Sequence, residues 1–188
     1  MAVILQTAHL QPSFADNIRG RLYGIFVPQG YDASPTVKIS QGTLRGTSDS
    51  TADGTKYYKF LGIPYAKSPV GNLRFSDPKD PEPWSGARDA TKFGSICHQV
   101  KGGSEDCLFV NVFTPQLPAA GRSEAAALLP VMVYIHGGAF VTGSGDISPG
   151  QLLNHGVVVA SINYRLNVFG ESSRRYSDFP NSSYLANK

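Results

Sequence analysis

The chain has 188 residues, and 41% of them are hydrophobic, so it can bury a core as one domain or as part of a larger one. Its 17 basic and 14 acidic residues are scattered and give a net charge of +3, which excludes a clustered basic surface for nucleic acid. The most apolar stretch, residues 125–135, contains a proline and is well short of the roughly 20 residues that span a bilayer, so no transmembrane helix is predicted.

Residues 1–35 show no sustained periodicity and contain several turn-forming prolines and glycines. This pattern predicts a variable N-terminal arm. The first residues contain a short apolar run that ends at Gln6, without a basic segment before it. We therefore expect no secretory signal in this stretch.

Short strands are predicted after the arm. Residues 36–47 (TVKISQGTLRGT) favour two strands around Gln41 and Gly42, and residues 56–63 favour a third. This order is typical of an antiparallel entry into a sheet. The stretch CLFVNVF at 107–113 alternates less, which indicates a buried strand.

Two further apolar runs are typical of parallel strands that are covered on both faces: PVMVYI at 130–135 and VVVASI at 157–162. A loop and the stretch PGQLLNH at 149–155, which favours a short helix, lie between them. Strand, helix and parallel strand in this order predict an α/β fold.

A glycine-rich stretch, HGGAFVTGSG at 136–145, follows the first of these runs. Glycines at such a point let backbone N–H groups approach a bound oxygen, and the stretch resembles the HGGG-type oxyanion loop of lipases and esterases. An ordinary glycine-rich turn is the alternative on these letters alone. A dinucleotide-binding loop does not fit, because Gly143 and Gly145 are not followed by the third glycine of G-x-G-x-x-G.

Four blocks together carry a resemblance to the carboxylesterase and cholinesterase family of α/β-hydrolases, and insect esterases are the most similar subfamily. In chain order they are FLGIPYAKSPVGNLRF (60–75), SEDCLFVNVFTP (104–115), HGGAF (136–140) and INYRLNVFG (162–170). The resemblance covers residues 36–170. It implies the N-terminal part of an α/β-hydrolase fold, with antiparallel entry strands leading into a mainly parallel sheet.

The resemblance also implies a chemistry. Family members hydrolyse small-molecule carboxylic esters through an acyl-enzyme, with a serine nucleophile, a histidine base and an acidic residue, and need no metal or cofactor. The matching oxyanion donors are the backbone N–H groups of Gly138 and Ala139, and Gly137 supports the turn. The methyl group of Ala139 would narrow the room beside its donor. His136 is expected to be a hydrogen-bonded loop residue and not the base.

Two residue pairs match structural features of the family. Cys97 and Cys107, the only cysteines, match a disulfide, and Arg74 and Glu105 match a structural ion pair, whose loss would leave a buried charge. A disulfide favours a secreted protein or one of the secretory pathway. The missing secretory signal favours the alternative of two buried thiols in a cytoplasmic protein.

Ser172 lies in GESSR, which begins like the nucleophile elbow G-x-S-x-G but has Arg174 in place of the second glycine. The family order is serine, acid, histidine, whereas every histidine here precedes Ser172: His9, His98, His136 and His155. We therefore expect Ser172 not to be a nucleophile.

Residues 171–188 are predicted to be a divergent tail, in which Asn181 begins a formal glycosylation triplet. Together these features predict an N-terminal fragment of a serine esterase that carries the oxyanion loop without the triad and is inactive as given. The alternative is a non-catalytic, cholinesterase-like binding or adhesion protein.

Overall fold

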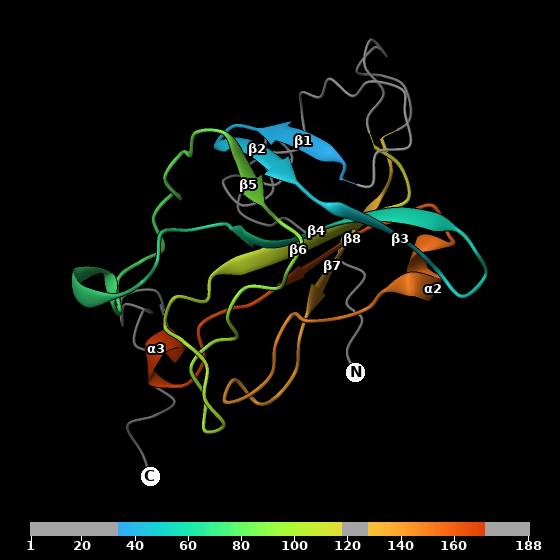
Figure 1. Ribbon diagram of the computed structural model, residues 1–188. Helices are drawn as coiled ribbons and strands as arrows, with labels where there is room; N and C mark the ends of the chain where they lie inside the picture. The colour runs from blue at the N-terminus through green and yellow to red at the C-terminus, as the bar shows by residue number, and fades with distance from the viewer. Residues whose placement is uncertain (1–33, 118–127, 172–188) are drawn as a thin grey trace.

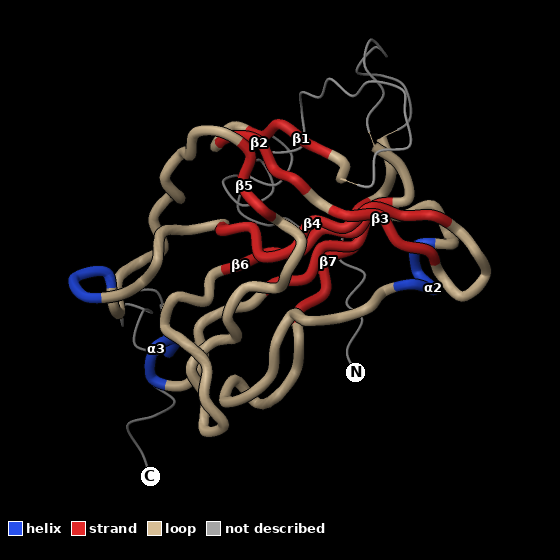
Figure 2. The backbone as a smooth tube through the Cα atoms, in the orientation of Figure 1, coloured by secondary structure: helices blue, strands red, loops and turns tan. Residues whose placement is uncertain are grey.

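The chain is described over residues 34–117 and 128–171 by a computed structural model, which places two β-sheets side by side (Figure 1). Helical segments are short, and loops carry most of the chain outside the strands (Figure 2). Most of the N-terminal arm and of the C-terminal tail lies outside the described residues. Five residues named above therefore have no described position: Gln6, His9, Ser172, Arg174 and Asn181.

The smaller sheet has the strand order β1-β2-β5. Strands β1 (Thr36–Ile39) and β2 (Gly42–Arg45) form an antiparallel hairpin, which confirms the two strands predicted around Gln41 and Gly42. Strand β5 (Ala87–Asp89) pairs with β2 in parallel and was not predicted. Its three residues are exposed and carry no apolar pattern by which the sequence could have revealed it.

The larger sheet has the order β3-β4-β6-β8-β7. Its strands are β3 (Thr47–Ser50), β4 (Lys56–Pro64), β6 (Phe109–Thr114), β7 (Val131–Ile135) and β8 (Val158–Ile162). Five consecutive residues of β6 are buried, as predicted for this strand. The predicted parallel pairing of β7 with β8 is confirmed, and the other pairs of this sheet are antiparallel.

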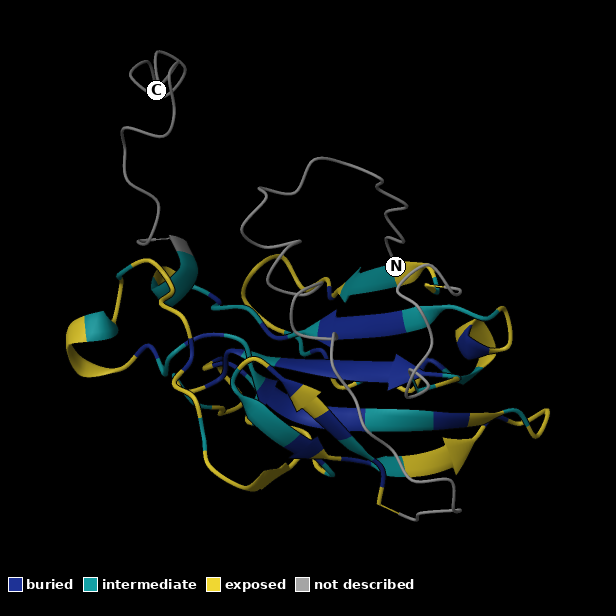
Figure 3. Cartoon of the chain, turned by 90° about the horizontal axis from the view of Figure 1, so that it is seen from above, coloured by how far each residue is buried: buried dark blue, intermediate teal, exposed yellow. Residues whose placement is uncertain are grey.

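Strand β7 departs from its prediction. It forms an edge of the sheet, and Val131 and Ile135 are 45% and 53% exposed, so the cover on both faces that its apolar pattern indicates is not present among the described residues. Its apolar composition resembles that of β8, whose central residues are buried. The difference comes from position, because β8 lies between two strands and β7 has a described neighbour on one side only. Figure 3 shows the buried residues concentrated in the middle of the sheet.

Helix α2 (Gly150–Leu153) lies within the stretch predicted to be helical and buries Leu153 in a core cluster with Phe113 and Val159. Helix α3 (Val168–Glu171) follows β8, so α2 and α3 lie at opposite ends of that strand (Figure 1). A single 3-10 turn, η1 (Gly71–Leu73), precedes Arg74. None of the helices in the described ranges has the length and apolar character that a bilayer crossing needs.

A bulge in β4 connects the two sheets. The pairing of β4 with β6 shifts between Phe60 and Ile63, and the Leu61 N–H released there donates to the carbonyl oxygen of Ala90 at 2.7 Å, directly after β5. The Gly62 N–H donates to Oδ1 of Asn111 at 2.9 Å. Apolar residues of both sheets share one core cluster, so the sheets pack as one body.

Candidate oxyanion loop and its surroundings

The loop after β7 turns sharply at three consecutive residues. Gly138 has φ 121°, and Ala139 and Phe140 have φ 53° and 60°, in the left-handed region that residues with a Cβ atom seldom adopt. The N–H groups of Val141 and Thr142 both donate to the Gly138 carbonyl oxygen, at 3.0 and 3.1 Å, and close the turn. Strained backbone of this kind persists where the surrounding contacts hold it.

Gly138 and Gly137 have different environments. A Cβ atom built on Gly138 would lie 1.9 Å from the Thr142 carbonyl oxygen, so no side chain fits there. A Cβ atom on Gly137 would meet nothing within 4 Å. The turn therefore requires glycine at 138, while position 137 borders open space.

Several adjacent donors of the loop are available. Within the described residues, the successive N–H groups of Gly137, Gly138, Ala139 and Phe140 donate to no protein acceptor, whereas those of Val141, Thr142, Gly143 and Gly145 do. A pair of neighbouring N–H groups without acceptors can hold a negatively charged oxygen.

His136 is a buried part of the loop, with 5% of its surface exposed. Its Nδ1 lies 2.8 Å from the Gly137 carbonyl oxygen, which can only accept, so Nδ1 carries the proton. Its Nε2 is buried without a partner among the described residues. Burial raises the pKa of the nearby Asp146 carboxyl, and the charge interaction with His136 opposes this shift. A ring held in this way shapes the loop and has no nitrogen directed at an open site.

A second anchor, which the sequence reasoning missed, holds the end of the loop. Asn163, directly after β8, accepts the Gly145 N–H at 2.7 Å, and the Gly145 carbonyl oxygen accepts from Ser161 at 2.6 Å and from Asn111 at 3.2 Å. All three side chains are buried. The one signal in the sequence is Asn111 itself, a polar residue in the middle of the apolar stretch CLFVNVF.

The described residues provide no nucleophile and base in contact. Among the described residues, no hydroxyl group is hydrogen-bonded to the ring of His98, His136 or His155. His98 lies edge-on against Phe169, with ring centroids 5.5 Å apart, and His155 lies in the turn after α2. The same part of the chain contains no group of three His, Cys, Asp or Glu side chains placed to bind a metal ion.

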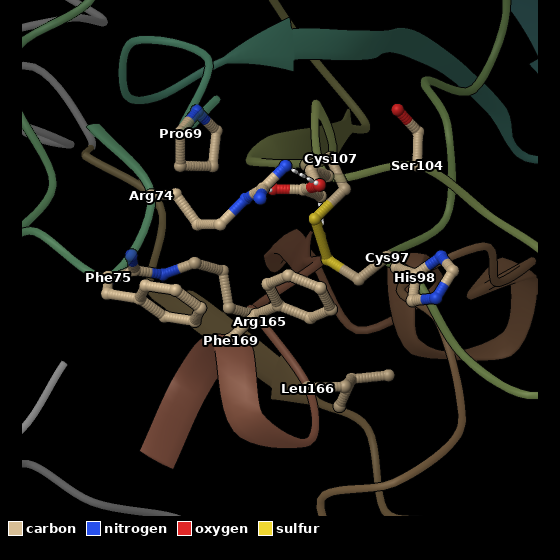
Figure 4. A pocket seen from close by; sticks show the side chains of 11 residues that line it. Pro69, Arg74, Phe75, Cys97, His98, Ser104, Cys107, Arg165, Leu166 and Phe169 are labelled. Atoms are coloured by element: carbon tan, nitrogen blue, oxygen red, sulfur yellow. Dashed lines mark hydrogen bonds and ion pairs between the residues drawn. A yellow bond between two sulfur atoms is a disulfide. The ribbon is translucent and has the colours of Figure 1, made fainter. Parts of the chain in front are cut away.

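The structure joins Cys97 to Cys107, with Cα atoms 4.9 Å apart, in the range that a disulfide requires. Beside it, Arg74 donates twice to the Glu105 carboxylate, each bond 2.6 Å long (Figure 4). The structure thus contains the ion pair expected between these two residues, but their side chains are 45% and 22% exposed, so the pair is not buried among the described residues. The Phe169 ring of α3 lies beside the pair, with its centroid 6.0 Å from the guanidinium carbon of Arg74.

A shallow pocket adjoins this ion pair. Figure 4 shows the rings of Phe75 and Phe169 lying parallel below Arg74, and their centroids are 5.8 Å apart. None of the residues that line the pocket belongs to the loop 136–145, so the pocket and the oxyanion loop are separate features.

The mixed sheet and the glycine-rich loop after β7 are those of a part of an α/β-hydrolase fold, and comparisons with known proteins agree. A profile of the carboxylesterase family matches residues 33–181, beyond the boundary at residue 170 expected from the sequence. The chain belongs to the carboxylesterase family.

The relatives include insect esterases. The chain is 41% identical over 171 residues to esterase FE4 of Myzus persicae, and this match covers 86% of the chain and 30% of that protein. It is 40% identical over 147 residues to juvenile hormone esterase of Tribolium castaneum, and this match covers 72% of the chain and 24% of that protein. The chain thus spans less than a third of the length of these relatives.

Solved structures give the same result. The crystal structure of juvenile hormone esterase from Manduca sexta, with OTFP covalently attached, has a TM-score of 0.66 and 38% identity and covers 73% of this chain and 27% of that one. A second solved structure, PNB esterase, has a TM-score of 0.62 and 42% identity, and the match covers 72% of this chain and 28% of that one. Both support the fold of the described residues.

Proposed function

We propose that this chain forms the oxyanion-binding part of a carboxylic ester hydrolase of the serine type, with the N–H groups of Gly138 and Ala139 as donors. The observation that carries the proposal is that Gly138 and Ala139 lie in the middle of a run of N–H groups, residues 137–140, without an acceptor in the described part of the chain, while the following part of the loop is held by hydrogen bonds. Membership of the carboxylesterase family and the esterase relatives support the same reading.

The chemistry follows from how an ester reacts. Attack on the ester carbonyl turns its oxygen into an oxyanion, and donors fixed beforehand stabilise that charge in the transition state. Loss of one such donor typically lowers the rate about 100- to 1000-fold. The substrate is then a small carboxylic ester, whose carbonyl oxygen lies beside Gly138 and Ala139 and whose size is limited by the Ala139 methyl group.

The described residues do not bring together the other half of this chemistry. A serine nucleophile needs a base within about 2.6 to 3.2 Å of its hydroxyl. His136 is engaged in the loop, and His98 and His155 lie elsewhere in the fold. Arg174 breaks the elbow around Ser172. We therefore infer that this chain binds an oxyanion but forms no acyl-enzyme.

Two measurements test the proposal. In the first, the chain is treated with a serine-directed organophosphonate and its intact mass is recorded, with a carboxylesterase as positive control. We expect no stoichiometric adduct, and labelling of Ser172 would contradict the inference.

In the second measurement, hydrogen–deuterium exchange of the chain is followed in methylphosphonate, a tetrahedral anion, and compared with exchange in sodium chloride of equal ionic strength. Slower exchange confined to residues 137–141 is expected in the wild type and in Ala139→Gly, which keeps both donors. Absence of this effect would refute the oxyanion site.

A further inference from the structure

Gln99 lies between the disulfide and the oxyanion loop, and its side-chain amide is fully hydrogen-bonded. Its Oε1 accepts from the Thr142 hydroxyl at 2.6 Å and from the Gly143 N–H at 3.1 Å. Its Nε2 donates to the carbonyl oxygens of Cys97 and Gly143, both at 3.0 Å. The residue is 7% exposed. Two donor and two acceptor contacts use the full capacity of an amide group.

The backbone of Gln99 is fixed independently of these contacts. Its N–H donates to the Gly102 carbonyl oxygen at 2.8 Å, and the Gly102 N–H donates back at 2.9 Å. Cys97 forms a parallel bridge with Ser104 at the base of this turn, and its disulfide to Cys107 closes the base of the segment, which we call the disulfide hairpin. The Gln99 side chain therefore projects from a cross-linked hairpin.

The residues that Gln99 holds determine the place of Gly138. The Thr142 N–H donates to the Gly138 carbonyl oxygen at 3.1 Å, and the Thr142 carbonyl oxygen fills the space where a Cβ atom of Gly138 would lie. A shift of Thr142 away from the hairpin would release both contacts. The conformation of the turn at Gly138 and Ala139 thus depends on where Gln99 holds Thr142.

We propose that Gln99 is a positioning residue for the oxyanion donors, which it sets by tying Thr142 and Gly143 to the disulfide hairpin. The role rests on the proposed function of Gly138 and Ala139. It requires an amide in particular, because the side chain must accept from two groups and donate to two carbonyl oxygens. A methionine of similar size makes none of these bonds. A glutamate keeps the acceptor but turns a second oxygen toward the Cys97 and Gly143 carbonyl oxygens, which repel it unless it is protonated.

The test is hydrogen–deuterium exchange of the full chain, read by mass spectrometry for the wild type, Gln99→Met and Gln99→Glu. The matched controls are Gln151→Met and Gln151→Glu, because Gln151 is an exposed glutamine in α2. We expect Gln99→Met to speed exchange of residues 141–145 by about tenfold or more, as for the loss of one to two net hydrogen bonds. Peptides from β4 and β6 report global folding and should not change.

The Gln99→Glu variant separates the effect of the amide hydrogen bonds from the effect of side-chain size. Gln99→Glu should exchange fast at residues 141–145 near neutral pH and recover part of its protection below about pH 4, where a protonated carboxyl can donate again. Rates are corrected for the intrinsic pH dependence of exchange, and Gln151→Glu should show no recovery. Unchanged exchange at 141–145 in Gln99→Met, or equal acceleration in β4 and β6, would overturn the proposal.

The same samples are then measured in methylphosphonate. The anion should slow exchange at 137–141 in the wild type and have at least about tenfold less effect in Gln99→Met, since the donors are no longer held together. Absence of an anion effect in the wild type would refute the proposed oxyanion site, whereas exchange at 141–145 decides the Gln99 contact by itself. The two failures are therefore distinguishable.

Discussion

Tyr164 holds His136 by two contacts at once: the rings stack with centroids 4.3 Å apart, and the Tyr164 hydroxyl donates to the His136 carbonyl oxygen at 2.7 Å. The first residue of the oxyanion loop is thereby fixed to the segment that follows β8. Together with the Asn163 contact to Gly145, this arrangement ties both ends of the loop to the end of one strand.

Removal of the Tyr164 contacts in two steps should loosen the start of the loop in two steps. Tyr164→Phe loses the hydroxyl bond, worth about 1 kcal/mol, and keeps the stacked ring, whereas Tyr164→Leu loses both. The exposed Phe140 provides the measurement, because chymotrypsin can cleave after it when the loop opens. We expect cleavage to rise from wild type to Tyr164→Phe to Tyr164→Leu. Tyr58→Phe is the control, and equal cleavage in all four proteins would contradict the role of the stack.

The two glycines of the loop should respond oppositely to alanine. Gly138→Ala places a methyl group against the Thr142 carbonyl oxygen and forces an unfavourable φ, so we expect a loss of about 2 kcal/mol or more in the free energy of unfolding. Gly137→Ala meets open space and should change it by less than about 0.5 kcal/mol. Urea unfolding followed by the fluorescence of Trp84, the only tryptophan, measures both. Similar losses in the two variants would show that the turn is not as tight as described.

The edge strand β7 should make the isolated chain associate with itself. Its outer side has no described partner, and Val131 and Ile135 are exposed on it. A lysine on such an edge opposes pairing with another strand, so Val131→Lys should raise the concentration at which light scattering detects assemblies. Val100→Lys is the control, since Val100 is fully exposed in a turn away from β7. A monomeric wild-type sample with a sharp, reversible melting transition would refute this prediction.

Alkaline pH should destabilise the fold through Tyr65. Burial raises the pKa of its hydroxyl, which donates to the Asn163 carbonyl oxygen at 2.7 Å, and the nearby Arg165 charge only partly opposes this shift. Above about pH 10 an unfolded tyrosine ionises while the buried one does not, so the unfolded state binds fewer protons and stability falls as pH rises. Below that pH the contribution is fully present.

Tyr65→Phe should therefore lower stability by about 1 kcal/mol near neutral pH, for the lost hydrogen bond, and flatten the alkaline decline. Urea midpoints measured from about pH 8 upward check both effects. Tyr164 and Tyr57 also have raised pKa values through burial, so part of the decline should remain. An unchanged slope in Tyr65→Phe would exclude Tyr65 as its main source.

Much of the fold could be predicted from sequence because the pattern that indicates a strand lies within the strand itself and the turns beside it. The hairpin around Gln41, the buried strand β6 and the parallel pair β7–β8 each follow from apolar residues and turn formers within a few positions. The glycine-rich stretch after β7 predicted the position of the loop for a similar reason, because its glycines are consecutive in the sequence and the turn depends on backbone conformation more than on side chains.

What could not be predicted depends on residues far apart in the sequence. The Gln99 amide meets Thr142 across 43 positions, and nothing in the letters CHQ indicates a buried glutamine. The exposure of side chains could not be predicted either. Whether the Arg74–Glu105 pair, Val131 and Ile135 are covered depends on which segments lie next to them in space. Charge and hydropathy along the chain contain no information on whether such a neighbour is present.

The bulge in β4 limits where chimeras of this chain and related esterases can be joined. Leu61 donates to the Ala90 carbonyl oxygen, and the Ala90 N–H in turn donates to the Arg45 carbonyl oxygen at 2.8 Å, so three distant segments meet at one point between the sheets. A crossover between residues 61 and 90 would take these segments from different parents, and Ala90, only 1% exposed, leaves no room for a mismatch. Chimeras whose junctions leave residues 45–90 in one parental block should therefore fold more often than chimeras with a junction inside it.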